Sequence, residues 1–164
     1  MRLLFLLLCL ANIAVAAGMI WWMPDPMATH FGTDHLADGF MSPAGYAVFM
    51  SGLVVLIAVI FLGMPRIAHR MPAWMWSFPN RKFWLSEEHR PETIRRLCSH
   101  FEVIGLAAML FFLLTQWQVF HANQTAPPQL NPTLFWLSLA AFLTAAITLS
   151  IRMTRSFRLP KKAE

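Results

Sequence analysis

Four long apolar runs divide this sequence, and each is long enough to form a helix that crosses a membrane. The runs cover residues 3–23, 44–64, 101–121 and 133–151. A helix needs about 20 apolar residues to span the hydrocarbon core of a bilayer. We therefore predict an all-α integral membrane protein, in which a bundle of four transmembrane helices forms a single domain over residues 1–164.

The distribution of lysine and arginine predicts how these helices are oriented. All 13 of these residues lie at position 2, in the segment 65–100 or in the tail 152–164. The connections 24–43 and 122–132 contain none. Because positive charge is retained on the cytoplasmic side of a membrane, we expect both termini and the segment 65–100 to be cytoplasmic. The two connections without positive charge are then extracytoplasmic.

The first apolar run also has features of a cleavable signal peptide. It follows Arg2, is rich in leucine and contains small residues at positions 14–17. The run then continues through Trp21 and Trp22 to Met23, which makes it longer than a typical signal core. Tryptophans at the end of a run are typical of a membrane interface. We therefore favour a retained transmembrane helix over a cleaved signal.

Charge and motifs narrow the classes of function. The chain carries a formal net charge of +5, but its basic residues flank apolar runs, where anionic lipid headgroups are the simplest partner. We expect contact with the lipid bilayer and not with nucleic acid. The sequence has no phosphate-binding glycine loop, HExxH, GxSxG or paired-cysteine motif, so we expect a non-enzymatic protein without a cofactor. Its oligomeric state is not predicted.

The outward connection 24–43 concentrates side chains that bind ligands or metals. Four of them lie within nine residues: His30, Asp34, His35 and Asp38. Imidazole and carboxylate groups suit zinc-like ions, so these four residues are weak candidates for a metal site. Gly32 and Gly39 argue against a regular helix that would fix their spacing. The alternative is a folded loop in which His30 is a hydrogen-bonding strut and Asp38 forms a turn with Gly39.

Polar residues inside the apolar runs form a second group of candidates. Glu102 is the only acidic residue in any run, and charge inside a membrane often marks a functional site. Its place at the inner end of the run, near Arg95, favours an ion pair at the interface. The alternative is a proton- or cation-responsive role, in which Asn12, Gln116 and Gln118 provide polar company if they face the same interior.

The fourth run places small residues four positions apart, at Ala140, Thr144 and Thr148. This spacing lets helices approach one another closely. We predict that this face packs inside the bundle of one chain and not against a second copy.

The outward connection resembles a known family of bacterial membrane proteins, the domain-of-unknown-function family 1648. That family has a proline-containing start, a His, a Phe and an Asp-Gly-aromatic triplet before its second span. The matching positions in this chain are Pro24, Pro26, His30, Phe31, Asp38, Gly39 and Phe40. His35 stands where the family usually has a glycine, so a turn that requires positive φ is disfavoured there.

The central segment adds a second motif to this resemblance. The family's Pro-Asn-basic-x-aromatic-Trp-Leu pattern is matched by Pro79, Asn80, Arg81, Phe83, Trp84 and Leu85. Larger relatives are similar to the immunity protein against a sporulation-delay toxin. The resemblance therefore implies a multi-pass protein of the bacterial cytoplasmic membrane, with a loosely implied role in immunity or sensing.

Three functional hypotheses follow. The leading one is a non-enzymatic membrane protein that binds an extracytoplasmic peptide or protein partner. Its candidate contact residues are His30, Phe31, Asp38 and Gly39 outside and Asn80 and Trp84 inside. The second is a small oligomeric transporter or ion-coupled permease component that uses Glu102. The third is a metal-dependent membrane enzyme that uses the outward histidines and aspartates.

Overall fold

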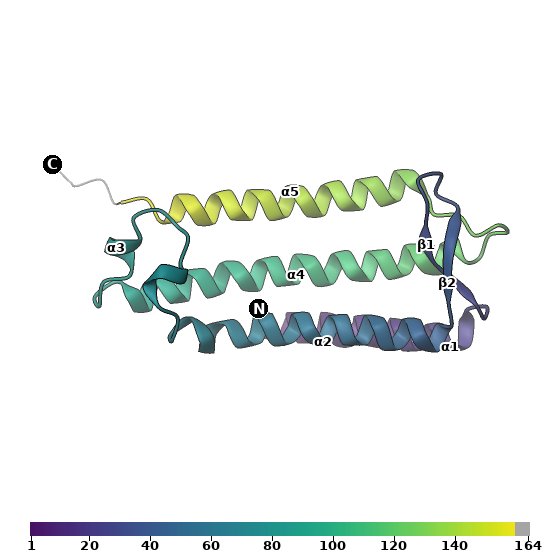
Figure 1. Cartoon of the computed structure of the whole chain (residues 1–164), viewed down its shortest axis with the longest axis horizontal. Coiled ribbons are helices and arrows are strands. Elements are labelled where there is room, and N and C mark those ends of the chain that lie inside the picture. Colours follow the sequence, from purple (N-terminus) through teal and green to yellow (C-terminus); the bar gives the residue numbers. More distant parts are fainter. Residues whose placement is uncertain (160–164) are drawn as a thin grey trace.

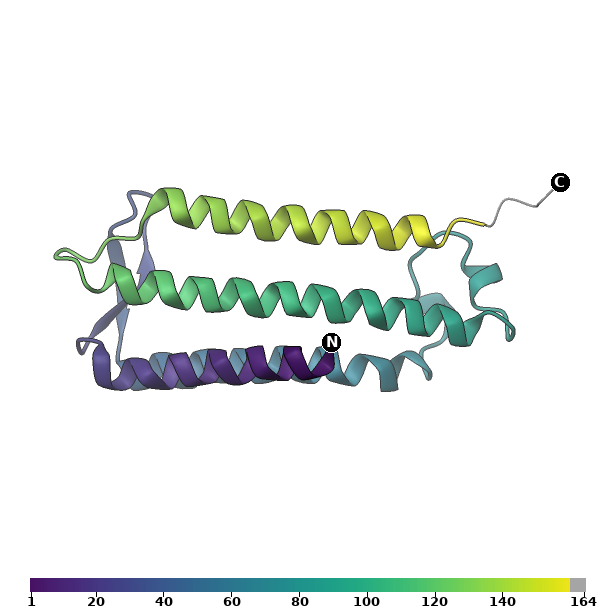
Figure 2. The ribbon, with the colours of Figure 1, turned by 180° about the vertical axis from the view of Figure 1, so that it is seen from behind.

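The computed structural model describes residues 1–159, and four long helices dominate it (Figures 1 and 2). They are α1 (Arg2–Trp22), α2 (Pro43–Ala68), α4 (Arg90–Ala122) and α5 (Pro132–Ser156). Each helix overlaps one of the four apolar runs and is long and apolar enough to cross a membrane. The prediction of four such helices is therefore confirmed. Three of them extend beyond their runs by a helical turn or more: α2 and α5 at their last turns and α4 at its start.

The arrangement is more open than the predicted four-helix bundle. Figure 1 shows α4 between α5 on one side and the pair α1 and α2 on the other. No residue in the range Pro132–Ser156 is buried. The small face of α5 is exposed, because α5 meets α4 through a different face, on which Phe142 stacks against Phe111 at 4.8 Å between ring centroids. The prediction that Ala140, Thr144 and Thr148 pack within the chain is therefore wrong.

Helices α1, α2 and α4 pack tightly because one position on α4 has no side chain. A Cβ atom at Gly105 would lie 2.9 Å from the ring of Phe61 and 3.1 Å from the ring of Phe5. The buried residues around this crossing include Cys9 and Met109. Small residues let membrane helices approach closely enough for such contacts.

Two amides cross the same helix interface. The side-chain Nε2 of Gln116 donates to Oδ1 of Asn12 at 2.8 Å, and Asn12 Nδ2 donates to the carbonyls of Leu8 and Met109 at 2.8 and 3.0 Å. Both side chains are fully buried. Hydrogen bonds of this kind between membrane helices contribute about 0.6–2 kcal/mol, so the pair holds α1 on α4 rather than forming an open site.

A β-hairpin covers one end of the helices, which we name the hairpin end. Strand β1 (Met27–Phe31) pairs antiparallel with β2 (Ala37–Met41), so the all-α prediction is wrong for this connection. Met27 and Ala28 are fully buried, and Met27 packs with residues at the ends of α1, α2 and α4. Consecutive side chains of a strand point to opposite faces, so the start of β1 is covered on both faces.

The hairpin turn includes a residue in the left-handed region. The Gly32 N–H donates to the Leu36 carbonyl at 2.9 Å, the His35 N–H donates to the Gly32 carbonyl at 3.0 Å, and Asp34 Oδ1 accepts the Leu36 N–H at 3.1 Å. His35 has a φ of 64°. The positive-φ turn that the sequence disfavours is therefore present, because histidine is among the residues that tolerate this region.

The connection between α4 and α5 holds the hairpin in place. The Ala37 N–H donates to the Pro128 carbonyl at 3.1 Å, and the Leu130 N–H donates to the His35 carbonyl at 3.0 Å. Asn123 pairs with both backbone groups of Ala28: its Oδ1 accepts the N–H at 2.7 Å and its Nδ2 donates to the carbonyl at 2.9 Å. The hairpin is thus bonded to this connection near both its start and its end.

The opposite end of the helices, which we name the basic end, carries an aromatic cluster. The connection there contains a short 3-10 helix, η1 (Ala73–Met75), and one helical turn, α3 (Arg81–Trp84). The buried members of the cluster are Ala68, Trp76, Trp84, Ile94, Leu97 and Phe157. These residues come from α2, the segment before α3, α3 itself, α4 and the position after α5. The cluster therefore joins all of these parts.

Candidate ligand-binding site beneath the hairpin

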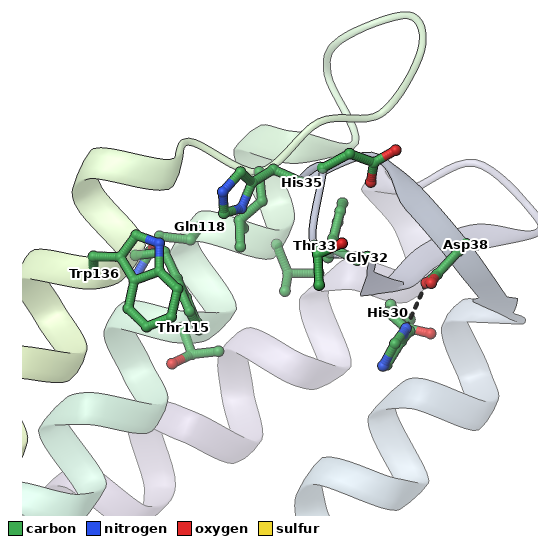
Figure 3. A pocket seen from close by; sticks show the side chains of 14 residues that line it. His30, Gly32, Thr33, His35, Asp38, Thr115, Gln118 and Trp136 are labelled. Atoms are coloured by element: carbon green, nitrogen blue, oxygen red, sulfur yellow. Dashed lines mark hydrogen bonds and ion pairs between the residues drawn. The ribbon is translucent and has the colours of Figure 1, made fainter.

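A pocket of about 850 Å³ lies between the hairpin, α4 and α5 (Figure 3). Helix α4 contributes Thr115, Gln118 and Val119 to its wall, and α5 contributes Phe135 and Trp136. The hairpin contributes residues 29–35 and Asp38, and the α4–α5 connection contributes Leu130. The volume falls within the range of about 300–1,000 Å³ that is typical of small-ligand sites.

All four residues of the predicted outward cluster line this pocket: His30, Asp34, His35 and Asp38. They do not converge on one point. His30 Nδ1 pairs with Asp38 Oδ1, whereas Figure 3 shows His35 on the side of Gln118 and Trp136. Within residues 1–159, no three His, Cys, Asp or Glu side chains are grouped so that they could hold a metal ion. The metal-dependent hypothesis therefore gains no ligand set from the described structure.

The pairing of His30 with Asp38 depends on the residue next to Asp38. Gly39 lies directly across from His30 in the two-stranded sheet, and a Cβ atom at Gly39 would lie 2.8 Å from the Cβ of His30. The predicted turn at Asp38 and Gly39 is wrong, because both residues lie within β2. His30 does act as the hydrogen-bonding strut that the folded-loop interpretation describes.

Replacing Gly39 by alanine is expected to lower the free energy of unfolding by about 1–3 kcal/mol, the usual range for an overpacked position. The added methyl group collides with a Cβ atom close to the backbone, so the two strands must move apart. Thermal unfolding in detergent micelles measures the effect. Gly52→Ala is the matched control, because nothing lies within 4 Å of a Cβ atom there. Equal losses for both variants would contradict the steric explanation.

Gln118 belongs to this pocket and not to the neighbourhood of Glu102. Its side chain is 4% exposed, and its Nε2 donates to Ser138 Oγ at 3.1 Å. Its Oε1 has no hydrogen-bond partner in the part of the chain that is described. Sequence reasoning considered Gln118 only as company for Glu102 and did not identify Thr115, Val119 or Phe135. One residue of this wall could have been identified, because Trp136 lies at the start of the fourth apolar run, next to the connection 122–132.

Phe31 lies at the end of β1 and serves two surfaces. It lines the pocket and also packs against the buried cluster at the hairpin end. The half-buried Phe31 side chain therefore lies between the pocket and the ends of α1, α2 and α4. The contribution of Phe31 to partner binding stays a prediction.

Glu102 forms an ion pair at the basic end. Its Oε1 lies 3.2 Å from Nε of Arg2, and the two side chains are 24% and 67% exposed, respectively. The sequence favours Arg95 as the partner, but the structure pairs Glu102 with the start of α1 instead. Gln116 is 14 positions farther along α4, or about 21 Å at ~1.5 Å per residue. Glu102 and the buried Asn12–Gln116 pair therefore do not form one site.

Asn80 and Trp84 make contacts within the chain at the basic end. Asn80 Nδ2 and Trp84 Nε1 both donate to the carbonyl of Phe157, at 3.1 and 2.8 Å. The Trp84 carbonyl accepts the hydroxyl of Thr93 at 2.7 Å, and the side chain of Arg96 lies over the Trp84 ring. These two residues hold the end of α5 to the central connection. Their contribution to partner binding stays a prediction.

The pocket beneath the hairpin thus gathers several of the predicted ligand-binding residues around one cavity of about 850 Å³. At the basic end, Glu102, Asn80 and Trp84 each line a separate, smaller pocket, of about 290, 450 and 410 Å³. These three residues also make contacts inside the chain. Comparison with protein-family models, with curated proteins and with solved structures finds no match to this chain.

Proposed function

We propose that this chain is a non-enzymatic, multi-pass protein of the bacterial cytoplasmic membrane that binds an extracytoplasmic ligand beneath its hairpin. The observation that carries the proposal is that one pocket is lined by His30, Asp34, His35 and Asp38 together with side chains of α4 and α5. The positive-inside rule supports the outward direction of this end, because the hairpin connection contains no lysine or arginine. The loose family resemblance favours a role in immunity or sensing.

The pocket has the composition of a binding site. Apolar and aromatic side chains make up one part of its lining, including Val119, Phe135 and Trp136, and a few polar groups lie among them. Such a lining buries apolar surface of a ligand while the polar groups fix its orientation. The hairpin is bonded to the α4–α5 connection, and Asn123 holds β1. The pocket therefore exists before a ligand arrives, which lowers the entropy lost on binding.

The transporter alternative has less support. Its candidate residues are separated between the ion pair of Glu102 with Arg2 and the buried pair of Asn12 with Gln116. Glu102 and Gln116 are too far apart along α4 for the two pairs to contact each other. The pocket, in contrast, gathers its candidate residues around one cavity.

Photo-crosslinking in living cells tests the proposed binding site. A photo-reactive amino acid replaces Thr33, which is exposed and lines the pocket, and in a second protein it replaces Phe40, which is 53% exposed on β2 and does not. We expect an adduct of defined mass from position 33 and not from position 40. Mass spectrometry of the purified protein identifies it.

Filling the pocket provides the decisive control. Thr115→Trp places a bulky ring in the lining, whereas Leu114→Trp adds the same ring at the next position on α4, which does not line the pocket. The adduct should disappear with Thr115→Trp and persist with Leu114→Trp. Adducts that are the same in both backgrounds, or no adduct at position 33, would remove the pocket as the binding site.

A further inference from the structure

The hairpin end carries unbalanced negative charge. The two connections at this end contain Asp25, Asp34 and Asp38 and no lysine or arginine. Asp34 and Asp38 both line the pocket. Asp38 pairs with His30 and its side chain is 53% exposed, and within residues 1–159 Asp34 takes part in no ion pair. Two carboxylates on one rim favour a ligand of positive charge.

The rest of the lining favours an apolar group on the ligand. Val119, Leu130 and Phe135 supply apolar surface, and Trp136 is 58% exposed. An exposed indole face attracts a cation as well as an apolar group. The described lining contains no lysine or arginine that would pair with an anionic group.

Gln118 adds an independent observation at the inner side of the pocket. Gln118 is only 4% exposed, and its Nε2 donates a hydrogen bond to Ser138 Oγ. Its Oε1 is left without a donor among the described residues. Buried polar atoms in folded proteins nearly always have a partner. This oxygen is closed to solvent, so a donor group of a ligand, such as an amide N–H or an ammonium, would satisfy it once the Gln118 amide rotates toward the pocket.

From these observations we propose that the pocket binds a cationic, amphipathic peptide. An apolar side chain of the peptide occupies the space beside Phe135 and Val119, a donor serves Gln118, and a lysine or arginine lies at the rim with Asp34 and Asp38. This inference rests on the proposed function, because it names the class of ligand for the same pocket. A zwitterionic lipid headgroup fits less well, since its phosphate would lie beside two carboxylates without a cation to balance it.

The test measures binding of two model peptides to the full chain in phosphatidylcholine nanodiscs. One fluorescent peptide is a helix of leucine and lysine, and the other has glutamate in place of every lysine. Fluorescence anisotropy gives each Kd, and nanodiscs without protein give the background from lipid alone. We expect the cationic peptide to bind at least about tenfold more tightly than the anionic one. This preference should shrink as salt is added, because the rim is exposed.

Two variants locate the charge effect, and a third fills the pocket. Asp34→Asn keeps the oxygen that accepts the Leu36 N–H and removes the charge, so we expect it to weaken binding of the cationic peptide by about tenfold. Asp25→Asn removes the same charge from the same connection but does not line the pocket, and it should have little effect. Thr115→Trp should abolish binding. Thermal unfolding of each variant verifies that it is folded.

The outcomes separate the ligand class from the site itself. If both peptides bind equally and Thr115→Trp abolishes both, the pocket is the site and the cationic class is wrong. If Thr115→Trp has no effect, both proposals fail. If neither peptide binds, the peptide class is overturned while the crosslinking result still decides the site. If adding phosphatidylethanolamine to the nanodiscs displaces the cationic peptide, the ligand is a lipid and the peptide inference is overturned.

Discussion

Replacing Phe157 by alanine is expected to lower the free energy of unfolding by about 3–5 kcal/mol, the range for removal of a fully buried aromatic ring. The Phe157 side chain is 0% exposed. Its ring stacks on Phe78 with 4.4 Å between centroids and meets Trp84 edge-on at 5.7 Å. Its loss leaves a cavity where the end of α5 meets the central connection. The variant should therefore loosen α5 more than the other long helices.

Chemical denaturation in mixed micelles measures this loss, and the position of α5 is followed by hydrogen exchange of its last turn. Trp74→Ala is the matched control, because it removes a larger ring that is 75% exposed. We expect a change within about 0.5 kcal/mol for the control, as for surface substitutions in general. Phe157→Leu should retain part of the stability, since it refills part of the cavity. Similar losses for Phe157→Ala and Trp74→Ala would contradict the role assigned to the ring.

The four helices could be predicted because each depends on signals that are local in sequence. A long apolar run sets the length of each helix, and side chains at two helix starts satisfy free backbone groups. Ser42 Oγ accepts the Gly45 N–H at 3.1 Å before α2, and Asn131 Oδ1 accepts the Leu134 N–H at 3.0 Å before α5. A proline follows each of these caps, which is the pattern expected at the first helical position.

The hairpin could not be predicted from the same kind of signal. Its strands are five residues each, and the ladder contains irregular register between Ala28 and Phe31. Its stability depends on Asn123 and on the α4–α5 connection, which lie about a hundred residues away in the sequence. Pairings over such separations are decided by tertiary structure and not by local pattern.

Only the hairpin side of the candidate site could be predicted from the sequence. The hairpin residues that line the pocket stand out in the sequence because histidine and aspartate gather in a short stretch. Gln118 stands out only as a polar residue in an apolar run, and Thr115 does not stand out, because their contribution to the pocket depends on how α4 is rotated and on where α5 lies beside it. The partner of Glu102 was missed likewise, since Arg2 lies 100 positions away.

Asn123→Ala is expected to release the hairpin from the helices and to lower the free energy of unfolding by about 2–4 kcal/mol. Asn123 serves both backbone groups of Ala28, a residue that is 0% exposed. Water cannot replace the lost partners without opening the strand, and each buried unsatisfied group costs about 1–3 kcal/mol. The third bond of Asn123, from Nδ2 to the carbonyl of Val119 at 2.9 Å, fixes the side chain for this purpose.

Hydrogen exchange of the Ala28 amide reports this release directly, because its N–H is the donor to Asn123 Oδ1. Exchange should accelerate in Asn123→Ala and stay slow in Gln124→Ala, which removes an exposed amide at the next position. Asn123→Asp keeps the acceptor but loses the donor, so the exchange rate of the Ala28 amide should lie between those of the other two variants. The pocket residues themselves are unchanged in Asn123→Ala, yet ligand binding should fall, because the hairpin no longer covers them. Protection of Ala28 that survives in Asn123→Ala would show that the α4–α5 connection holds the hairpin without this side chain.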